Sequence, residues 1–119
     1  PNIKVTGWVD NKTALNYLAD TDIFTLTSLW EGLPMALLEA MYMEKLCIVS
    51  NVVGNNNVIH DGQNGYICDS VDDFIKKIKS ISTERYALTN LTKNAHTDVV
   101  NHYNSTIMAN EYKKIYLAR

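Results

Sequence analysis

The feature that most restricts the fold of this chain is the order in which two apolar patterns alternate along it. Short apolar runs, such as Leu46–Ser50 and Tyr66–Cys68, are typical of buried strands. Between them lie longer stretches in which apolar residues recur at helical spacing, as Phe74, Ile78 and Ile81 do. Strands that alternate with helices form a parallel sheet with helices on both faces. The sequence therefore predicts an α/β domain of three layers, similar to a Rossmann fold.

The same patterns, with turn and capping residues, predict where each element begins and ends. Asp10 or Asn11 is expected to cap the first helix, and Thr83 a later one. In chain order we expect a strand over residues 3–7, a helix over 11–18, a strand over 22–27, a helix over 34–43, a strand over 46–50, a polar loop over 51–57, a helical turn from 58, a strand over 66–68, and helices over 71–81, 84–96 and 103–117.

One junction in this series predicts a binding site for an anion. The strand over 22–27 leads through Ser28 and Gly32 to Pro34, which is favoured at the first position of a helix because its missing N–H needs no partner there. The free N–H groups of Met35 and Ala36 would then point outward, and the helix dipole attracts negative charge to them. We therefore expect a phosphate at the beginning of this helix.

Two carboxylates flank the expected phosphate. Glu39 lies in an apolar stretch between Met35 and Met43, and a carboxylate there can accept two hydrogen bonds from a cis-diol such as a ribose. Glu31, in the turn before the helix, would face the group that the phosphate carries. This arrangement suits a nucleotide-activated donor. The alternative from spacing alone is a helix with two exposed acids near its dipole-favoured end.

In the run from Glu31 to Met41, seven residues separate Glu31 from Glu39. This run resembles the motif of retaining GT-B glycosyltransferases, a glutamate followed by seven residues and a second glutamate. The resemblance is to family four in particular, the glycosyl transferases group 1. Further segments match in the family's order, so the resemblance covers about positions 3 to 70; they are residues 5–9, 19–24 and 61–66.

This resemblance implies that residues 1–119 are a single domain that binds a nucleotide sugar. It would be the C-terminal, donor-binding half of a GT-B fold, truncated at its N-terminus, with the helix over 103–117 packing toward the missing N-terminal domain. Family positions give Glu31 the catalytic role and assign the remaining contacts as follows: Ser28, Gly32, Leu33, Pro34, Met35 and Ala36 to the donor sugar and diphosphate, and Glu39, Leu37 and Gly7 to the ribose and nucleoside.

The implied reaction is transfer of a sugar from a nucleotide diphosphate sugar to a hydroxyl acceptor, with retention of configuration. The resemblance places it in polysaccharide or glycoconjugate synthesis, without a metal or other cofactor. The missing N-terminal domain would hold the acceptor and provide any peripheral contact with a membrane. We therefore expect little or no turnover by this chain alone. A non-catalytic nucleotide-binding or scaffold domain of doubly wound α/β fold is the alternative.

Charge and cysteine usage narrow the possible partners and compartments. The net charge of −2 does not favour nucleic acid, and no apolar run is long enough to cross a bilayer. Cys47 and Cys68 lack the spacing of metal ligands, which indicates buried free thiols in a reducing compartment. We therefore expect a cytoplasmic protein, including the cytoplasmic face of the membrane.

Some residues with possible chemical roles are given structural ones instead. Asp20 and Asp22 form an Asp-x-Asp pattern, but at the amino end of a strand, away from the edge where ligands bind. Trp8 is interpreted as ordinary packing in preference to contact with a base. The loop from Gly54 to Asn57 departs from the family's usual Gly-Gly turn with Pro and Glu, so the role of Asn57 stays open.

Overall fold

The computed structural model describes residues 2–81, 83, 85–106, 109–110 and 113–114. Its centre is a parallel sheet of three strands in the order β1 (Ile23–Leu26), β2 (Leu46–Ser50) and β3 (Tyr66–Cys68). The predicted parallel α/β domain is therefore confirmed. The helices are α1 (Asn11–Ala19), α2 (Met35–Tyr42), α3 (Asn55–Val58), α4 (Val71–Ile81) and α5 (Arg85–His102).

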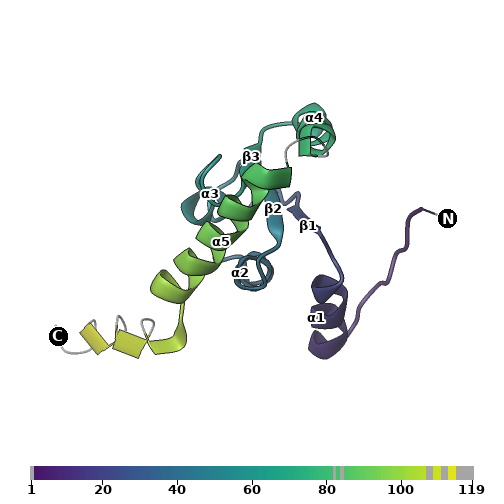
Figure 1. Cartoon of the computed structure of the whole chain (residues 1–119). Coiled ribbons are helices and arrows are strands. Elements are labelled where there is room, and N and C mark those ends of the chain that lie inside the picture. Colours follow the sequence, from purple (N-terminus) through teal and green to yellow (C-terminus); the bar gives the residue numbers. More distant parts are fainter. Residues whose placement is uncertain (1, 82, 84, 107–108, 111–112, 115–119) are drawn as a thin grey trace.

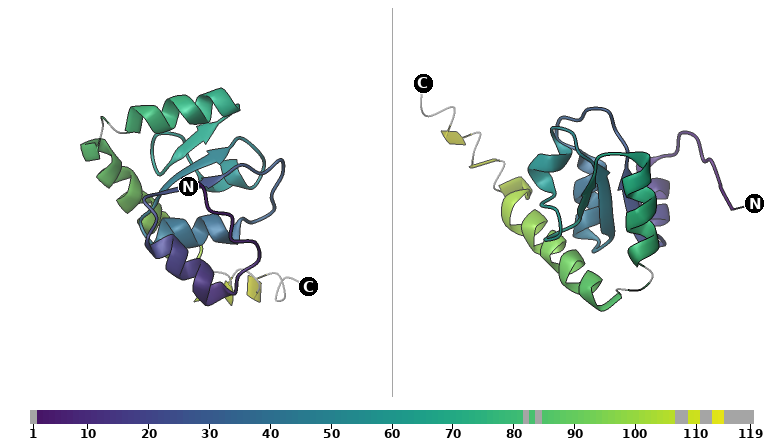
Figure 2. Two further views of the ribbon diagram at one scale, coloured as in Figure 1. Left: turned by 90° about the vertical axis from the view of Figure 1, so that its right-hand side faces the viewer. Right: turned by 90° about the horizontal axis from the view of Figure 1, so that it is seen from above.

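Helices cover both faces of this sheet, as Figures 1 and 2 show. Side chains alternate along the central strand β2, so Cys47 and Val49 face one layer and Leu46 and Ile48 face the other. The first layer contains α2 and α5, and the second contains α4. All four of these β2 side chains are at most 4% exposed, so the central strand is buried on both sides, as parallel sheets require.

Helix α2 is held firmly in the first layer. Leu37, Leu38, Ala40 and Met41 are buried and form much of the core with residues of α5. The C-terminal end of the helix is fixed by a 2.6 Å hydrogen bond between the ring of His96 and the carbonyl of its last residue. The position of α2, which carries the predicted site, is therefore set by core packing.

Most predicted boundaries are confirmed. Strands β2 and β3 and helix α4 have the predicted ends, and α1 ends at Ala19, one residue beyond its predicted end. Asp10 caps α1, since its carboxylate accepts a 2.8 Å hydrogen bond from the backbone N–H of Thr13. Helix α5 continues to His102 instead of His96, because Ala95 and Val99 extend its buried stripe by one more turn.

The strand predicted over residues 3–7 is absent from the sheet. Ile3 and Val5 are 87% and 88% exposed, and Figure 1 shows this segment running away from β1. Trp8 is 90% exposed, so the predicted packing of this side chain is also wrong. Alternation of apolar residues marks a segment that can form a strand, but a strand needs a neighbour for its backbone hydrogen bonds.

Two local predictions also need correction. The expected polar loop over 51–57 ends early, because α3 begins at Asn55. Pro34, predicted to be the first residue of the helix, is instead the N-cap of α2, which begins at Met35; the ψ of Pro34 is 92°, in the extended region. Of the helix predicted over 103–117, residues 105–106, 109–110 and 113–114 are helical and residues 103–104 form a bend, while its other positions lie outside the described residues. Its packing toward another domain stays a prediction. Within the described part of the chain, no helix has both the length and the apolar character needed to cross a membrane.

Candidate functional site

The loops that leave β1 and β2 are joined at the carboxyl edge of the sheet. The strands are parallel, so both end at this edge, where Ser28 follows β1 and Ser50 ends β2. The hydroxyl of Ser50 donates a 2.6 Å hydrogen bond to the backbone carbonyl of Ser28. Ligands of open α/β sheets bind outside this edge. The predicted site residues therefore lie on a loop that is fixed to the neighbouring strand.

The same loop holds the carboxylate of Glu31. The hydroxyl of Ser28 donates a 2.6 Å hydrogen bond to Oε1 of Glu31, and both residues are half-buried. Hydrogen bonds from a hydroxyl to a carboxylate are short and stronger than those between neutral groups. Ser28 thus fixes the predicted catalytic group.

Asn55, at the beginning of α3, holds Ser50 in place through hydrogen bonds. Its side chain is 0% exposed, and its Nδ2 donates to the carbonyl and the hydroxyl of Ser50 at 3.2 and 3.3 Å. Its Oδ1 is buried without a hydrogen-bond partner in the described structure. Turning the amide over would place Oδ1 against the Ser50 carbonyl, which cannot donate, so the observed orientation is the favourable one.

Gly54 lets the second loop come very close to the first. Its φ of +97° is left-handed, and a Cβ added there would meet the backbone oxygen of Gly32 and lie 2.6 Å from that of Glu31. A residue with a side chain would therefore displace the Glu31–Gly32 backbone. The structure gives Gly54 a steric role next to the candidate catalytic residue.

The N-terminal end of α2 is open to solvent. Its first helical hydrogen bond runs from Leu38 N–H to the carbonyl of Pro34 at 3.2 Å, and no side chain caps the helix. Met35 and Ala36, whose N–H groups precede that bond, are exposed. An uncovered helix end of this kind attracts anions through its free N–H groups and its dipole.

Glu39 lies one turn further along α2, in the wall of an apolar cavity of about 440 Å³. Glu31 is not among the residues lining this cavity, so the two glutamates have different surroundings. Met35 connects them, since it belongs both to the helix end and to the cavity wall. The residues lining the cavity are Leu15, Met35, Leu38, Glu39, Tyr42, Met43, Val99 and Tyr103.

Two of the residues predicted to contact the nucleoside differ from the rest in their surroundings. The side chain of Leu37 is fully buried in the core, so a contact with a nucleoside cannot come from this side chain. Gly7 precedes α1 and lies outside the sheet, and a Cβ added to it would meet nothing within 4 Å, so its contact with the nucleoside stays a prediction. The other predicted residues lie on the loop after β1 or on the first turns of α2; they are Ser28, Glu31, Gly32, Leu33, Pro34, Met35, Ala36 and Glu39.

Sequence reasoning missed the support given by Ser50 and Asn55. The position of Ser50 at the end of a strand was a usable signal, because polar residues at carboxyl edges often face ligands. Asn55 carried no such signal, since it is one of three successive asparagines that the sequence does not distinguish. Only the fold shows that this one is buried and the next two are exposed.

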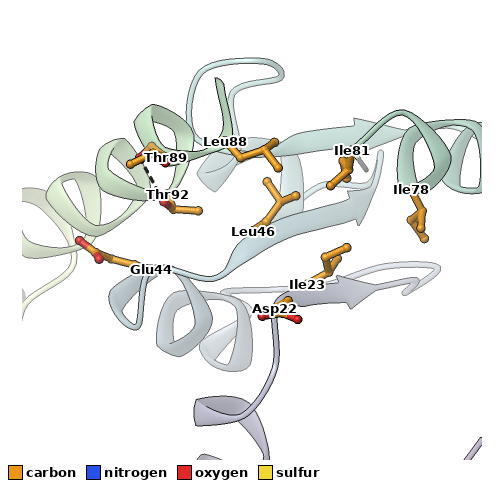
Figure 3. A pocket seen from close by; sticks show the side chains of 9 residues that line it. All are labelled: Asp22, Ile23, Glu44, Leu46, Ile78, Ile81, Leu88, Thr89 and Thr92. Carbon is orange, nitrogen blue, oxygen red and sulfur yellow. Dashed lines mark hydrogen bonds between the residues drawn. The ribbon is translucent and has the colours of Figure 1, made fainter. Parts of the chain in front are cut away.

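A second cavity, of about 460 Å³, lies at the opposite edge of the sheet (Figure 3). Asp22 and Leu46, at the amino ends of β1 and β2, line it together with apolar residues of α4 and α5. Its position at the amino ends of the strands argues against a ligand site. The described residues contain no group of three or more His, Cys, Asp or Glu side chains able to hold a metal ion.

Both cysteines are buried free thiols. Burial raises the pKa of Cys47 to about 12. Burial, and next the negative charge of Asp73, raises the pKa of Cys68. Neither thiol is therefore activated as a nucleophile.

Known proteins resemble this chain in sequence and in fold. A galactosyltransferase of Escherichia coli, named for UDP-Gal and alpha-D-GlcNAc-diphosphoundecaprenol, is 34% identical over 104 residues, covering 86% of this chain. An alpha-1,3-N-acetylgalactosaminyltransferase of Campylobacter jejuni, which acts on N,N'-diacetylbacillosaminyl-diphospho-undecaprenol by name, is 33% identical over 101 residues, covering 83% of this chain. This chain spans only 27% of the length of each of these relatives.

A solved structure of Anabaena HepE in complex with UDP and glucose superimposes with a TM-score of 0.81. It shares 15% sequence identity and covers 87% of this chain and 29% of its own, so it shows the fold alone. The model of the family "Glycosyl transferases group 1" matches residues 1–98. The chain belongs to the glycosyl transferases group 1 family.

Proposed function

We propose that this domain binds a nucleotide diphosphate sugar at the N-terminal end of α2. Within the whole protein, it would support transfer of the sugar to a hydroxyl acceptor with retention of configuration. The observation that carries the proposal is the open, uncapped helix end next to the fixed carboxylate of Glu31 at the carboxyl edge of the sheet.

The N–H groups of Met35 and Ala36 would bind the diphosphate. Negative charge grows on this group as the bond to the sugar breaks, and preoriented N–H groups stabilise that charge without reorganising. The helix dipole adds to the effect. The domain would therefore not need a metal ion to stabilise the leaving group.

Glu31 would lie beside the donor sugar. Its carboxylate, held by Ser28, would orient sugar hydroxyls or stabilise the positive charge that develops at the reacting carbon. The backbone N–H groups of Gly32 and Leu33 would contact the sugar hydroxyls, and the absence of a side chain at Gly32 lets the ligand approach.

Glu39 would accept hydrogen bonds from the ribose. It is half-buried in a mostly apolar cavity wall that begins at Met35, so a ligand at the helix end can extend toward it along α2. A carboxylate about one turn, roughly 5 Å, from the phosphates suits a ribose attached to them. Glu31 would thus contact the sugar of the donor, and Glu39 its nucleoside.

The names of the relatives suggest the chemical class of the donor. The galactosyltransferase of Escherichia coli is named for UDP-Gal, and the HepE structure holds UDP and glucose. We therefore propose a UDP-sugar donor, used in polysaccharide or glycoconjugate synthesis on the cytoplasmic side of the membrane. Residues 1–119 would act as one donor-binding domain.

A separate N-terminal domain of the whole protein would bind the acceptor. Leu29 and Trp30, on the Glu31 loop, are 90% and 82% exposed and offer that domain an apolar contact surface. The segment over 103–117 would pack toward the same domain.

Titration of the chain with UDP, followed by the amide shifts of residues 35–39, tests the proposal. We expect saturable shifts at Met35 and Ala36, and an affinity for UDP about tenfold weaker in Glu39→Ala, as for the loss of about 1.4 kcal/mol. The control is Asp72→Ala, which removes an exposed acid on α4 and should bind UDP like the wild type. No shift at the helix end, or an unchanged affinity in Glu39→Ala, would contradict the assignment.

A further inference from the structure

We infer that Ser50 and Asn55 are positioning residues that fix the Glu31 carboxylate for sugar transfer. Neither residue needs to touch the donor, because both act through the loop over 28–32. The inference rests on the proposed function, since it assigns them to the site in which Glu31 meets the sugar.

A continuous series of hydrogen bonds leads from Asn55 to Glu31. Nδ2 of Asn55 donates to the carbonyl and hydroxyl of Ser50 at 3.2 and 3.3 Å, and that hydroxyl donates to the Ser28 carbonyl at 2.6 Å. The Ser28 hydroxyl then donates to Oε1 of Glu31 at 2.6 Å. Asn55 thus sets the direction of the Ser50 hydroxyl, and Ser50 fixes the residue that holds the carboxylate.

A steric contact acts in parallel with these hydrogen bonds. Gly54 comes directly before Asn55, and a Cβ added to it would lie 2.6 Å from the backbone oxygen of Glu31. A shift of Asn55 would therefore carry Gly54 with it and change its contact with the Glu31–Gly32 backbone. The loop is therefore held by Ser50 at Ser28 and contacted by Gly54 at Glu31 and Gly32.

The unpaired Oδ1 atom of Asn55 argues against a purely structural role for this residue. Its Oδ1 is buried without a partner, and an unpaired buried acceptor lowers the stability of a fold. An apolar side chain at this fully buried position would avoid that loss. Compared with an apolar residue, Asn55 contributes two hydrogen bonds to Ser50. Through Ser50 and Ser28, these bonds fix the position of Glu31.

The positioning itself can be measured in the chain without any ligand. NMR of the wild type should show one rotamer of the Glu31 side chain. In Ser50→Ala and Asn55→Ala, we expect averaged Glu31 couplings and displaced amide shifts over residues 28–32, with unchanged shifts in α5. Ser50→Thr, which keeps the hydroxyl, should restore the wild-type values. An unchanged Glu31 rotamer in both alanine variants would overturn the inference.

Turnover of the whole protein with a panel of UDP-sugars supplies the functional readout. We expect kcat to fall at least tenfold in Ser50→Ala and Asn55→Ala, with the affinity for UDP within twofold of wild type and with rescue in Ser50→Thr. Ser50→Ala should have no further effect in a Glu31→Ala background, because it acts through Glu31. Equal loss in both backgrounds would overturn the inference.

The matched control is Asn64→Ala, which removes the other buried asparagine and should leave the Glu31 rotamer unchanged. Failure of the wild type to bind UDP or to use any of the sugars would instead overturn the proposed function. The ligand-free NMR result would then still report on the hydrogen bonds alone.

Discussion

Asn55 and Asn64 are buried to almost the same degree, at 0% and 2% exposure, yet they are used differently. Asn64 has partners for both ends of its amide: it accepts a 2.7 Å hydrogen bond from His60 N–H and donates to the Val58 carbonyl and to Asp98 at 3.1 and 2.8 Å. Asn55 donates from one end and leaves Oδ1 unpaired. The comparison separates a polar side chain that joins elements of the fold from one that supports the candidate site.

The partners of Asn64 explain why it is fully paired. They lie at the end of α3, in the turn before β3, and on α5, so this single side chain links three parts of the chain. Among the described residues, the side chain of Asn55 bonds to Ser50 alone, at the edge of the sheet that faces the α2 end. The hydrogen bonds of Asn64 therefore contribute mainly to the stability of the fold, whereas those of Asn55 mainly set the geometry of the candidate site.

The largest expected effect is the difference in stability between the two alanine variants. Asn64→Ala leaves the His60 N–H, the Val58 carbonyl and the Asp98 carboxylate without this partner, which should lower the free energy of unfolding by about 2–4 kcal/mol. Asn55→Ala loses only bonds to Ser50 and removes an unpaired oxygen, so we expect about 1 kcal/mol or less. Urea unfolding of both variants measures the difference. Equal losses would break the comparison.

A smaller loss is expected from Gly54→Ala. The left-handed φ and the contact with the backbone of Glu31 and Gly32 cannot both be kept, so the two loops must move apart at a cost of about 1–3 kcal/mol. Amide shifts should change over 28–32 and leave those around Asn64 as they are. Gly62→Ala, at another left-handed glycine but in open space, is the matched control and should not move the Glu31 loop.

The labelling rates of the two thiols give a kinetic test of the difference between Asn55 and Asn64. Cys68 lines a cavity of about 300 Å³ together with Ser28 and Ser50, whereas Cys47 lies in the core cluster with Val58. With a thiol reagent, Asn55→Ala should therefore speed the labelling of Cys68 several-fold and Asn64→Ala that of Cys47. Single-cysteine variants assign the rates. Identical rates in both backgrounds would show that the two regions open as one unit.

The smallest expected effect concerns the Asp10 cap of α1, which lies outside the surroundings of both asparagines and serves as a reference for them. Hydrogen bonds from Thr13 lower the pKa of Asp10 below its ordinary value of 3.8. The stability that this cap gives α1 is therefore complete above pH 3.8 and is lost as the pH falls through the lower folded pKa. The Thr13 amide shift should follow this titration equally in Asn55→Ala and Asn64→Ala, since neither amide titrates.

Local patterns were enough to predict much of the fold. Strands β2 and β3 and helix α4 were predicted with the correct ends, because their apolar periods stop at turn or capping residues. The motif from Glu31 to Glu39 was correctly expected to open a helix at the carboxyl edge. These features depend on residues close together in the sequence.

The remaining features depend on contacts between distant residues. The segment over 3–7 has the alternation of a strand, but pairing is decided by a neighbour and not by its own sequence. The inward face of α2, which buries Leu37, follows from its packing against α5. The hydrogen bonds of Asn55 and Ser50 join α3, β2 and the loop after β1, so no local pattern predicts them.

Helix α2 contributes four buried side chains to the core while its first turn stays open to solvent. Any molecule that binds this turn must therefore also hold the core together, because unfolding α2 would release it. The melting temperature then becomes a direct gauge of occupancy, rising with the free concentration of a ligand that binds only the folded chain. Heating the domain with one nucleotide sugar after another would rank candidate donors before any acceptor is known.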